Sequence, residues 1–308
     1  MITTQLISGL GNQLFQWAVA RALAEKHHTE VLLDIAAFKT QTFSYAAAFP
    51  RPFKLQRFKI KAGIATAAQT NAARDFFKMS RYRRHRIMLL ARLKLKTLIP
   101  RIREPSFSFH PEILEAGNPA YLSGYWPSGK YFEAIAPIIR QEAQLADDEI
   151  VERAHRFVAA HRQPGAPVVG VQVRRGDIHY LYTVLKKPEL APMPLITRDY
   201  FVSAMQRFGD RCTFLMFSDS EKDLQLCREE FKDCKRIIYV AGNDDVTDFA
   251  VLQACDHQII SNSTFGWWAA WLNPKRDKTV VAPRDWYLPT SPHANTLPDL
   301  IPSGWTLN

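Results

Sequence analysis

The sequence has little that indicates a metal site, a disulfide framework or a membrane span. Its four cysteines, Cys212, Cys227, Cys234 and Cys255, form no C-x-x-C pair, which is typical of reduced, partly buried thiols in a cytoplasmic protein. The nine histidines include no H-E-x-x-H or similar cluster, so no metal site is predicted. No apolar run is long enough to cross a bilayer, and no signal-peptide pattern opens the chain. We therefore expect a cytoplasmic protein.

Acidic residues are absent from one stretch, and this absence accounts for the whole net charge of +10. Residues 78–103 contain ten Lys and Arg, and the remaining 30 balance the 30 Asp and Glu of the chain. Leucine, isoleucine and methionine alternate with these bases, as in a basic amphipathic helix. Such a helix packs on its own domain or binds an anionic membrane, here the inner face of the plasma membrane. No nucleic-acid-reading motif accompanies the charge, so we expect no nucleic acid partner.

The order of apolar patterns predicts an α/β protein with two domains. Residues 2–34 read as strand, helix and strand, with a glycine turn at the tip of the first strand. After a Pro/Gly-rich linker at 160–167, short apolar runs alternating with helical segments predict a parallel sheet covered on both faces. These runs are 168–173, 213–218, 236–240, 257–261 and 279–283. We place the N-terminal domain at 1–160 and the C-terminal domain at 161–308.

Polar motifs follow three of the predicted C-terminal strands, at the sheet edge where α/β proteins bind ligands. The first, "RRGD", contains Arg174, Arg175 and Asp177. Arginine offers fixed, always charged donors that match phosphate oxygens, so this motif favours a phosphate-bearing ligand. The alternative is a structural salt bridge between arginine and Asp177. The second, "SDS", carries Asp219.

The third motif, "SNST", precedes a helix that carries Trp267, Trp268 and Trp271. The hydroxyls of Ser263 and Thr264, together with the free N–H groups of the helix start, predict an anion pocket. The tryptophans are interpreted as core residues rather than as a stacking platform.

The N-terminal turn, "SGLGNQLFQ", has the first two glycines of a dinucleotide-binding loop, Gly9 and Gly11. The third glycine position holds Leu14, which weakens that interpretation, and no Walker A lysine follows. The turn is therefore an anion-binding turn with Asn12 at the helix start, or a packing feature. An NAD-dependent oxidoreductase that uses Gly9, Gly11 and Asp34 stays open as an alternative.

Taken in order, these motifs resemble those of the inverting α-1,2-fucosyltransferases, glycosyltransferase family 11. The resemblance rests on "SGLGNQLFQWAVARALA", "SGYWPSGKYF", "VGVQVRRGD", "FLMFSDSEKDL", "ISNSTFGWWAAWLN" and "VVAPRDWY". It implies a GT-B fold, with two Rossmann-like domains facing each other across a cleft. It also implies transfer from GDP-β-L-fucose to the 2-hydroxyl of a β-galactoside, in a free oligosaccharide or a lipid-linked glycan, with no cofactor and no required metal.

The resemblance also suggests roles for individual residues. Arg174, Ser263 and Thr264 are expected to bind the diphosphate, and Asp219 the guanine or ribose. Arg175 is expected either to assist in binding the diphosphate or to hold the Asp177 turn. Gly11 and Asn12 would reach the β-phosphate, and Asp177 is the candidate general base.

Gln172 stands where the family motif has histidine. Glutamine can donate and accept hydrogen bonds, so a contact of Gln172 with the donor is still expected, but it cannot carry a proton and is not expected to act as an acid or base. A non-catalytic protein that binds glycans or membranes remains the other alternative.

Overall fold

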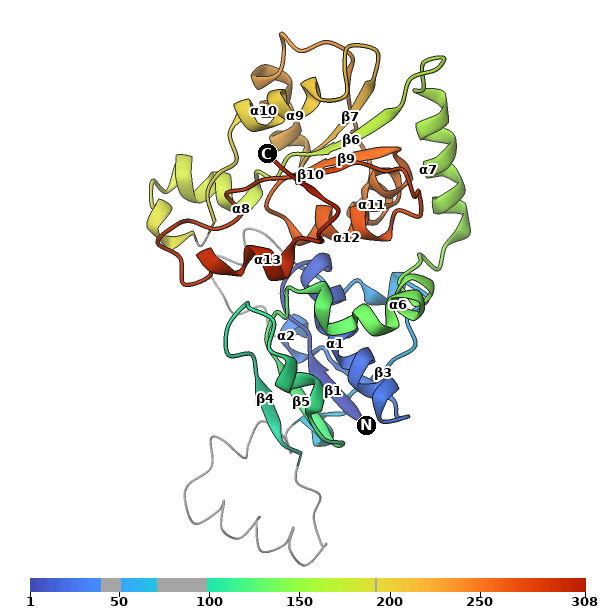
Figure 1. The fold of residues 1–308 in the computed structure, drawn as a ribbon, viewed down its shortest axis with the longest axis vertical. Coiled ribbons are helices and arrows are strands. Elements are labelled where there is room, and N and C mark those ends of the chain that lie inside the picture. Colours follow the sequence, from blue (N-terminus) through green and yellow to red (C-terminus); the bar gives the residue numbers. More distant parts are fainter. Residues whose placement is uncertain (40–50, 71–98, 192) are drawn as a thin grey trace, which may run out of the picture. The chain divides into compact units, whose positions relative to one another are not determined.

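The structure of this protein is a computed structural model that describes residues 1–39, 51–70, 99–191 and 193–308. The chain divides into two compact units, each with its own sheet (Figure 1). The N-terminal unit comprises Met1–Gln56 and Ile60–Glu142, and the C-terminal unit comprises Arg57–Lys59 and Ala143–Asn308. The predicted α/β class, with two Rossmann-like parts, is confirmed.

The sheet of the N-terminal unit contains five parallel strands. Their order is β3 (Gly63–Ile64), β2 (Val31–Asp34), β1 (Ile2–Gln5), β5 (Ala120–Ser123) and β4 (Arg101–Arg103). Helix α1 (Leu10–Lys26) connects β1 to β2, which confirms the predicted strand–helix–strand unit. The strand order reverses between β1 and β5, so their carboxyl ends mark the ligand-binding edge of this sheet.

Helix α1 lies against the sheet with most of its side chains buried. Leu14, Phe15 and Trp17 are fully buried, and the Phe15 ring lies 6.2 Å from that of Phe132. The remaining helical segments of the unit are short. They are α2 (Ala36–Lys39), α6 (Ala136–Glu142) and 3₁₀ turns at Leu55–Arg57, Pro111–Glu115 and Gly129–Ile135.

The prediction of a basic helix over 78–103 is wrong at its C-terminal end. Arg101–Arg103 forms the strand β4, in which Ile102 pairs with Leu122 of β5. Pairing with the buried strand β5 satisfies backbone groups that a helix would otherwise bond internally. Residues 78–98 lie outside the described residues.

The sheet of the C-terminal unit has the strand order of a Rossmann fold. Across the sheet, the strands are β8 (Ile237–Tyr239), β7 (Thr213–Phe217), β6 (Val168–Gln172), β9 (His257–Ile260), β10 (Val280–Ala282) and β11 (Thr306–Leu307). Numbered along the unit, this order is 3-2-1-4-5-6, and the point of reversal lies between β6 and β9. Five strands match predicted runs to within one residue at each end. The two-residue β11 was not predicted.

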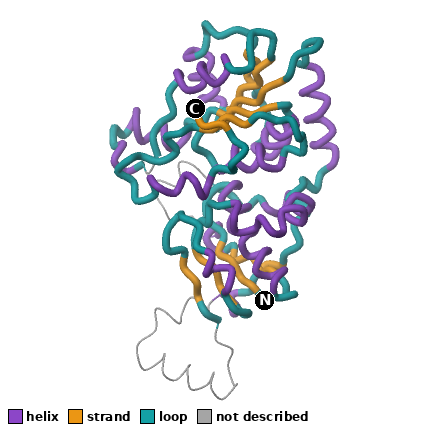
Figure 2. Tube along the Cα trace, in the orientation of Figure 1, coloured by secondary structure: helices purple, strands orange, loops and turns teal. Residues whose placement is uncertain are grey.

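Helices cover both faces of this sheet (Figures 1 and 2). The helices α9 (Arg198–Gln206) and α10 (Glu221–Glu230) cover one face, and α11 (Asp245–Ala254) and α12 (Thr264–Leu272) cover the other. Val169 and Val171 of β6 pack with Phe201 of α9. Alternate residues of one strand therefore enter two different cores, which explains the unbroken apolar runs. Short helical segments also occur at α8 (Gly176–His179), Tyr180–Val184, Pro188–Leu190, Ala294–Thr296 and α13 (Leu297–Leu300).

Two glycines allow α11 and α12 to lie directly on the strands. A Cβ at Gly170 would lie 2.5 Å from Leu252 Cδ1 of α11, and a Cβ at Gly266 would lie 2.9 Å from Gln172 Oε1 of β6. A side chain at either position would therefore force its neighbour to move. Trp267 and Trp268 of α12 are fully buried, which confirms their interpretation as core residues.

Helix α7 (Asp148–Ala160) groups with the C-terminal unit, although the predicted boundary placed it in the N-terminal domain. Its apolar stripe packs along α11, and Arg153 Nη2 donates a hydrogen bond to Thr247 Oγ1 at 3.3 Å. The sequence at 160–167 is turn-rich because it connects α7 to β6 within one unit.

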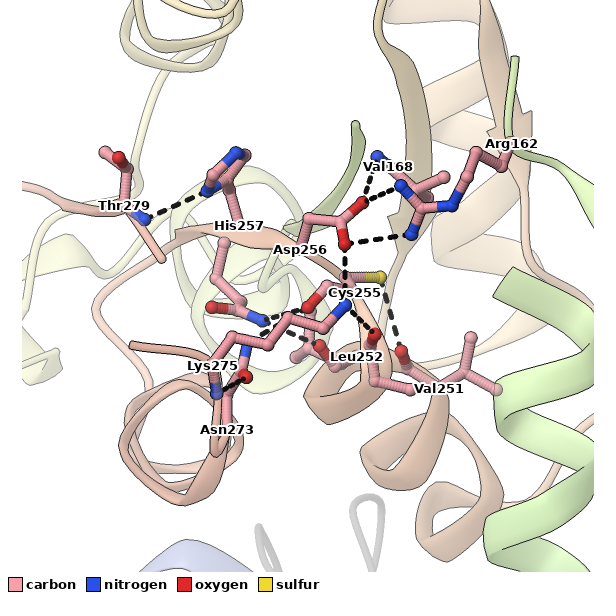
Figure 3. Close-up of polar contacts among 12 residues, drawn as sticks. Arg162, Val168, Val251, Leu252, Cys255, Asp256, His257, Asn273, Lys275 and Thr279 are labelled. Carbon is pink, nitrogen blue, oxygen red and sulfur yellow. Dashed lines mark hydrogen bonds and ion pairs between the residues drawn. The ribbon is translucent and has the colours of Figure 1, made fainter. Parts of the chain in front are cut away.

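A charged cluster closes the edge of this sheet at the amino ends of β6 and β9 (Figure 3). The carboxylate of Asp256 accepts hydrogen bonds from Arg162 (2.8 Å), Lys275 (2.6 Å) and the backbone N–H of Val168 (2.7 Å). Burial alone would raise the pKa of Asp256, but these bonds outweigh it and hold the pKa well below its ordinary value. One carboxylate thus joins three segments that are distant in the sequence.

Candidate active site

Polar side chains connect the ends of β6 and β9, the two strands at which the C-terminal sheet reverses its order. Ser261 Oγ donates a hydrogen bond to Gln172 Oε1 at 2.9 Å and accepts one from the backbone N–H of Arg174 at 3.2 Å. The "RRGD" and "SNST" motifs therefore lie side by side at the predicted ligand-binding edge. Ser261 was not singled out from the sequence, although its position directly after a buried strand was the available signal.

Arg174 is the arginine of this edge that pairs with the predicted base. Its Nη2 donates to Asp177 Oδ1 at 2.8 Å, and both side chains are about one-sixth to one-fifth exposed, at 16% and 20%. Asp177 Oδ1 also accepts the backbone N–H of Ile178 at 3.0 Å. Asp177 thus orients the guanidinium of Arg174.

Arg175 has a different environment, which does not support the expected contact with the donor. Its guanidinium is buried and donates to Glu230 Oε2 at 2.6 Å and to the carbonyl oxygen of Ile196 at 3.0 Å. It also lies 6.0 Å from the centre of the Phe201 ring. An arginine buried with these partners links the strand end to α10, which favours the alternative that Arg175 holds the turn.

Asp219 holds the backbone of the "RRGD" turn. Its Oδ2 accepts the backbone N–H of Arg175 at 2.7 Å, and it follows the end of β7, the neighbour of β6. Gly176 has a φ of +35°, and a Cβ there would lie 3.1 Å from Asp219 Cγ. The turn therefore needs glycine at 176 and a short acidic side chain at 219. Asp219 is exposed, and it follows the carboxyl end of β7, so it lies at the same sheet edge as Arg174.

Gln172 is buried beneath α12, next to Gly266, with its side-chain oxygen accepting the Ser261 hydroxyl. It serves to join β6 and β9 and contributes only indirectly to a surface that binds a ligand. An uncharged side chain suits this position, since an ionised group there would have to be desolvated. The predicted contact of Gln172 with the donor is therefore not supported.

Helix α12 begins at this edge. Ser263 is its N-cap residue, with extended backbone angles (φ −134°, ψ 126°) and no hydrogen bond from its side chain to the first turn. Thr264 is the first helical residue. The first N–H groups of a helix have no partner inside it and attract anions. The start of α12 follows Ser261, which accepts the backbone N–H of Arg174, and anion binding by Ser263, Thr264 and Arg174 stays a prediction.

The glycine turn of the N-terminal unit is held by side-chain amides. Asn12 Nδ2 donates to Ser8 Oγ at 2.9 Å, and Ser8 has a φ of +68°. Helix α1 begins at Leu10, so Gly11 lies inside its first turn. Gln16, an unexpected contributor, accepts the N–H of Ile7 and donates to the carbonyl of Gly124, each at 3.0 Å. The available signal was a glutamine that lies between the apolar residues Phe15 and Trp17.

Asp34 is buried and hydrogen-bonded within the N-terminal unit, and this argues against its binding a ribose. It is 1% exposed and accepts hydrogen bonds from the Tyr121 hydroxyl at 2.5 Å and the Ala36 N–H at 3.0 Å.

Within the parts of the chain that the structure describes, no group of three or more His, Cys, Asp or Glu could hold a metal ion. No described helix is long and apolar enough to cross a membrane.

A Rossmann-like sheet with an arginine and a helix N-terminus at its point of reversal is typical of α/β proteins that bind phosphate-bearing ligands. The model of the family described as "Glycosyl transferase family 11" matches residues 1–305. The chain belongs to this family, as its motifs predict, and is a glycosyltransferase rather than an oxidoreductase or a non-catalytic binding protein.

Curated relatives differ in how much of the chain they match. An Escherichia coli "Alpha-1,2-colitosyltransferase" is 23% identical over 93% of this chain and 92% of its own. The Escherichia coli "O-antigen biosynthesis glycosyltransferase WbnK" is 26% identical over 92% of this chain and 93% of its own. The mouse "Galactoside alpha-(1,2)-fucosyltransferase 2" is 31% identical over 51% of this chain and 45% of its own. Among solved structures, apo POFUT1 aligns with 91% of this chain and 97% of its own at 13% identity, with a TM-score of 0.47.

Proposed function

We propose that this protein transfers L-fucose from GDP-β-L-fucose to the 2-hydroxyl of a β-galactoside, with inversion at the anomeric carbon. Membership of glycosyltransferase family 11 supports the reaction type, and a galactoside α-1,2-fucosyltransferase among the relatives supports the sugars. The observation that carries the proposal is the position of Arg174 beside the start of α12, at the reversal point of the C-terminal sheet. The acceptor is a free oligosaccharide or a lipid-linked glycan.

The donor's diphosphate binds the C-terminal unit at this edge. Arg174 neutralises the charge that develops on the leaving diphosphate, since preorganised cationic donors are worth most where charge forms in the transition state. Ser263 and Thr264 hold phosphate oxygens through their hydroxyls and the N–H groups of the first turn. Asp219 accepts hydrogen bonds from the guanine or ribose. Arg175 keeps the turn in place through Glu230.

The reaction breaks the bond between the fucose anomeric carbon and the β-phosphate oxygen, and GDP leaves with that electron pair. The acceptor oxygen bonds to the opposite face of the same carbon and loses its proton to Asp177 or to solvent. Asp177 is the nearest carboxylate to Arg174 along the turn, and it combines orientation of the guanidinium with this proton transfer. The roles of Gly11 and Asn12 at the β-phosphate stay predictions.

The test is GDP release from GDP-fucose with a panel of β-galactosides, assayed with and without EDTA, followed by NMR linkage analysis of the product. We expect an α-1,2 linkage and equal rates in both conditions, since we propose that no metal is required. GDP-colitose, whose sugar lacks the 3-hydroxyl of fucose, is the matched alternative donor, because a colitosyltransferase is among the relatives. Transfer from GDP-colitose alone, or a product with another linkage, would contradict the proposal.

A further inference from the structure

A single carboxylate holds the turn that follows β5 in the N-terminal unit. We define the Gly124 turn as residues 124–126. Glu104, the residue after β4, accepts the N–H of Tyr125 at 2.6 Å through Oε2 and the N–H of Trp126 at 2.7 Å through Oε1. A Cβ at Gly124 would lie 2.3 Å from Glu104 Cβ and 2.7 Å from Oε2, so only glycine fits beside this carboxylate. Glu104 therefore determines the backbone of the turn.

The Gly124 turn has features that cost free energy. Trp126 has a φ of +58°, a conformation that large side chains rarely adopt, and its buried indole Nε1 has no hydrogen-bond partner within the described part of the chain. Burial raises the pKa of Glu104 to about 7, although the two backbone N–H groups act in the opposite direction. Strained residues and perturbed carboxylates gather at functional sites. A turn that only closed a loop could avoid all three features.

The turn lies at the ligand-binding edge of its sheet. It directly follows β5, and β1 and β5 are the strands between which the order reverses. Gln16 donates to the Gly124 carbonyl and accepts the N–H of Ile7, so the turn is bonded to the loop that carries the glycine motif. The Gly124 turn is therefore part of the same edge as the motif "SGLGNQLFQ".

The turn presents an aromatic residue suited to a sugar. Trp126 is fully buried, and its ring meets Tyr131 edge-on at 5.8 Å, so it anchors the turn. Tyr125 is only half-buried and meets Phe107 edge-on at 5.7 Å. A tyrosine offers an apolar ring to the CH face of a sugar and a hydroxyl to its hydroxyl groups. Its chemistry fits an uncharged glycan better than the phosphate-bearing donor.

We propose that Glu104 is a positioning residue for the acceptor, which holds the Gly124 turn so that Tyr125 contacts the acceptor sugar. This inference rests on the proposed function, since it assigns the β-galactoside to this edge of the N-terminal unit. Glu104 itself acts through the turn. Replacement by glutamine leaves one of the two N–H groups facing an amide NH₂, so the turn loses its geometry while the size of the side chain is kept.

The first experiment measures steady-state kinetics of Glu104→Gln with GDP-fucose and lactose, a simple β-galactoside. Glu115→Gln is the matched control, since that carboxylate lies in the same stretch of chain but its side chain is 75% exposed. We expect the KM for lactose to rise about tenfold in E104Q, because one of the two backbone N–H groups loses its acceptor. The KM for GDP-fucose and the rate of GDP release without acceptor should match those of the wild type and of E115Q. An unchanged KM for lactose, or an equal rise in both KM values, overturns the proposal.

A second variant covers the case in which E104Q does not fold. Tyr125→Ala removes the contact and leaves Glu104 in place, and it should raise the KM for lactose without changing that for GDP-fucose. An unchanged KM for lactose in Y125A overturns the proposal.

Calorimetric titration of lactose into the GDP-bound protein needs no turnover, so it separates the proposed function from the proposed role of the Gly124 turn. Failure of the wild type to transfer fucose refutes the proposed function alone. Lactose binding that is present in the wild type and lost in Y125A supports the role of the turn. Binding that is equal in both, or absent from the wild type, refutes that role.

Discussion

The guanidinium groups of Arg174 and Arg175 have different partners, although the two residues are adjacent in the chain. Arg174 pairs with Asp177 at the carboxyl edge of the sheet, and Arg175 pairs with Glu230 of α10 in a buried position. Successive residues at a strand end point in opposite directions, so one serves the ligand edge and the other the packing of the unit. This difference separates the expected effects of their substitutions.

Substitution of Arg174 should affect catalysis more than stability. We expect Arg174→Ala to lose about 3 kcal/mol of transition-state stabilisation, roughly 100-fold in kcat/KM, by analogy with the loss of a catalytic donor. The measurement is the initial rate of GDP release with a saturating acceptor, together with the unfolding midpoint. Arg156→Ala, which removes an arginine whose side chain is 67% exposed, is the control. Turnover of R174A close to that of the wild type would refute the assignment of Arg174 to the diphosphate.

Substitution of Arg175 should lower stability first. Removing Arg175 leaves the partly buried carboxylate of Glu230 and the carbonyl oxygen of Ile196 without their donor, so Arg175→Ala should reduce the free energy of unfolding by about 2 kcal/mol. Denaturant titration followed by tryptophan fluorescence measures this change. Donor affinity of the fraction that remains folded should stay near that of the wild type. A large fall in donor affinity with unchanged stability would instead support a direct contact between Arg175 and the donor.

The Asp256 cluster should make stability depend on pH in the acidic range. The pKa of Asp256 is lower in the folded protein than in the unfolded chain, so the folded state binds fewer protons. This stabilisation is present above the unfolded pKa of about 3.9 and is lost as pH falls towards the folded value. Asp256→Asn should therefore be less stable at neutral pH by about 2 kcal/mol, with a smaller difference from the wild type at low pH. Unfolding midpoints between pH 7 and pH 3 test this, with the exposed Asp277→Asn as control. A difference between D256N and the wild type that stays constant with pH would contradict it.

Substitution of Asn12 tests whether the glycine turn of the N-terminal unit contacts the donor. If Asn12 contacts the donor, Asn12→Ala should lower kcat/KM by about fivefold, corresponding to one hydrogen bond of about 1 kcal/mol. Ser8→Ala is the informative comparison, because it removes the acceptor of the Asn12 hydrogen bond and keeps the amide. If N12A and S8A lose the same stability and their kinetics are unaltered, the glycine turn serves only packing.

The basic segment at 78–103 provides the prediction about membranes. If this segment binds an anionic membrane, reversal of charge at Arg83, Arg84 and Arg86 should abolish sedimentation with anionic phosphatidylglycerol liposomes, while activity on a soluble acceptor persists. The control is the same reversal at three exposed bases of the C-terminal unit, Arg207, Lys222 and Lys235. Equal liposome binding by both triple variants and the wild type would show that this segment does not bind a membrane.

Much of the fold could be predicted because it depends on local patterns. The unbroken apolar runs at 168–173 and 213–218 are the strands β6 and β7, and the "SNST" motif begins α12 as expected. Arg101–Arg103 was assigned wrongly because a three-residue edge strand has no periodicity of its own and forms only by pairing with β5. Helix α7 was assigned to the wrong unit for a related reason, since a helix pattern does not indicate which partner its apolar stripe will meet.

The chain of amino acids by itself determined the family, the α/β class and the order of the motifs, because these depend on residue types and on their spacing. The tertiary structure alone decided which side chains of each motif reach the ligand edge. It buried Gln172 and Arg175, left Arg174 with Asp177, and brought Glu104 to the N–H groups of Tyr125 and Trp126. The direction and the burial of a side chain depend on contacts between residues that are far apart in the chain. The motif "SGLGNQLFQ" shows the same limit, since its link to Gly124 through Gln16 spans 108 residues.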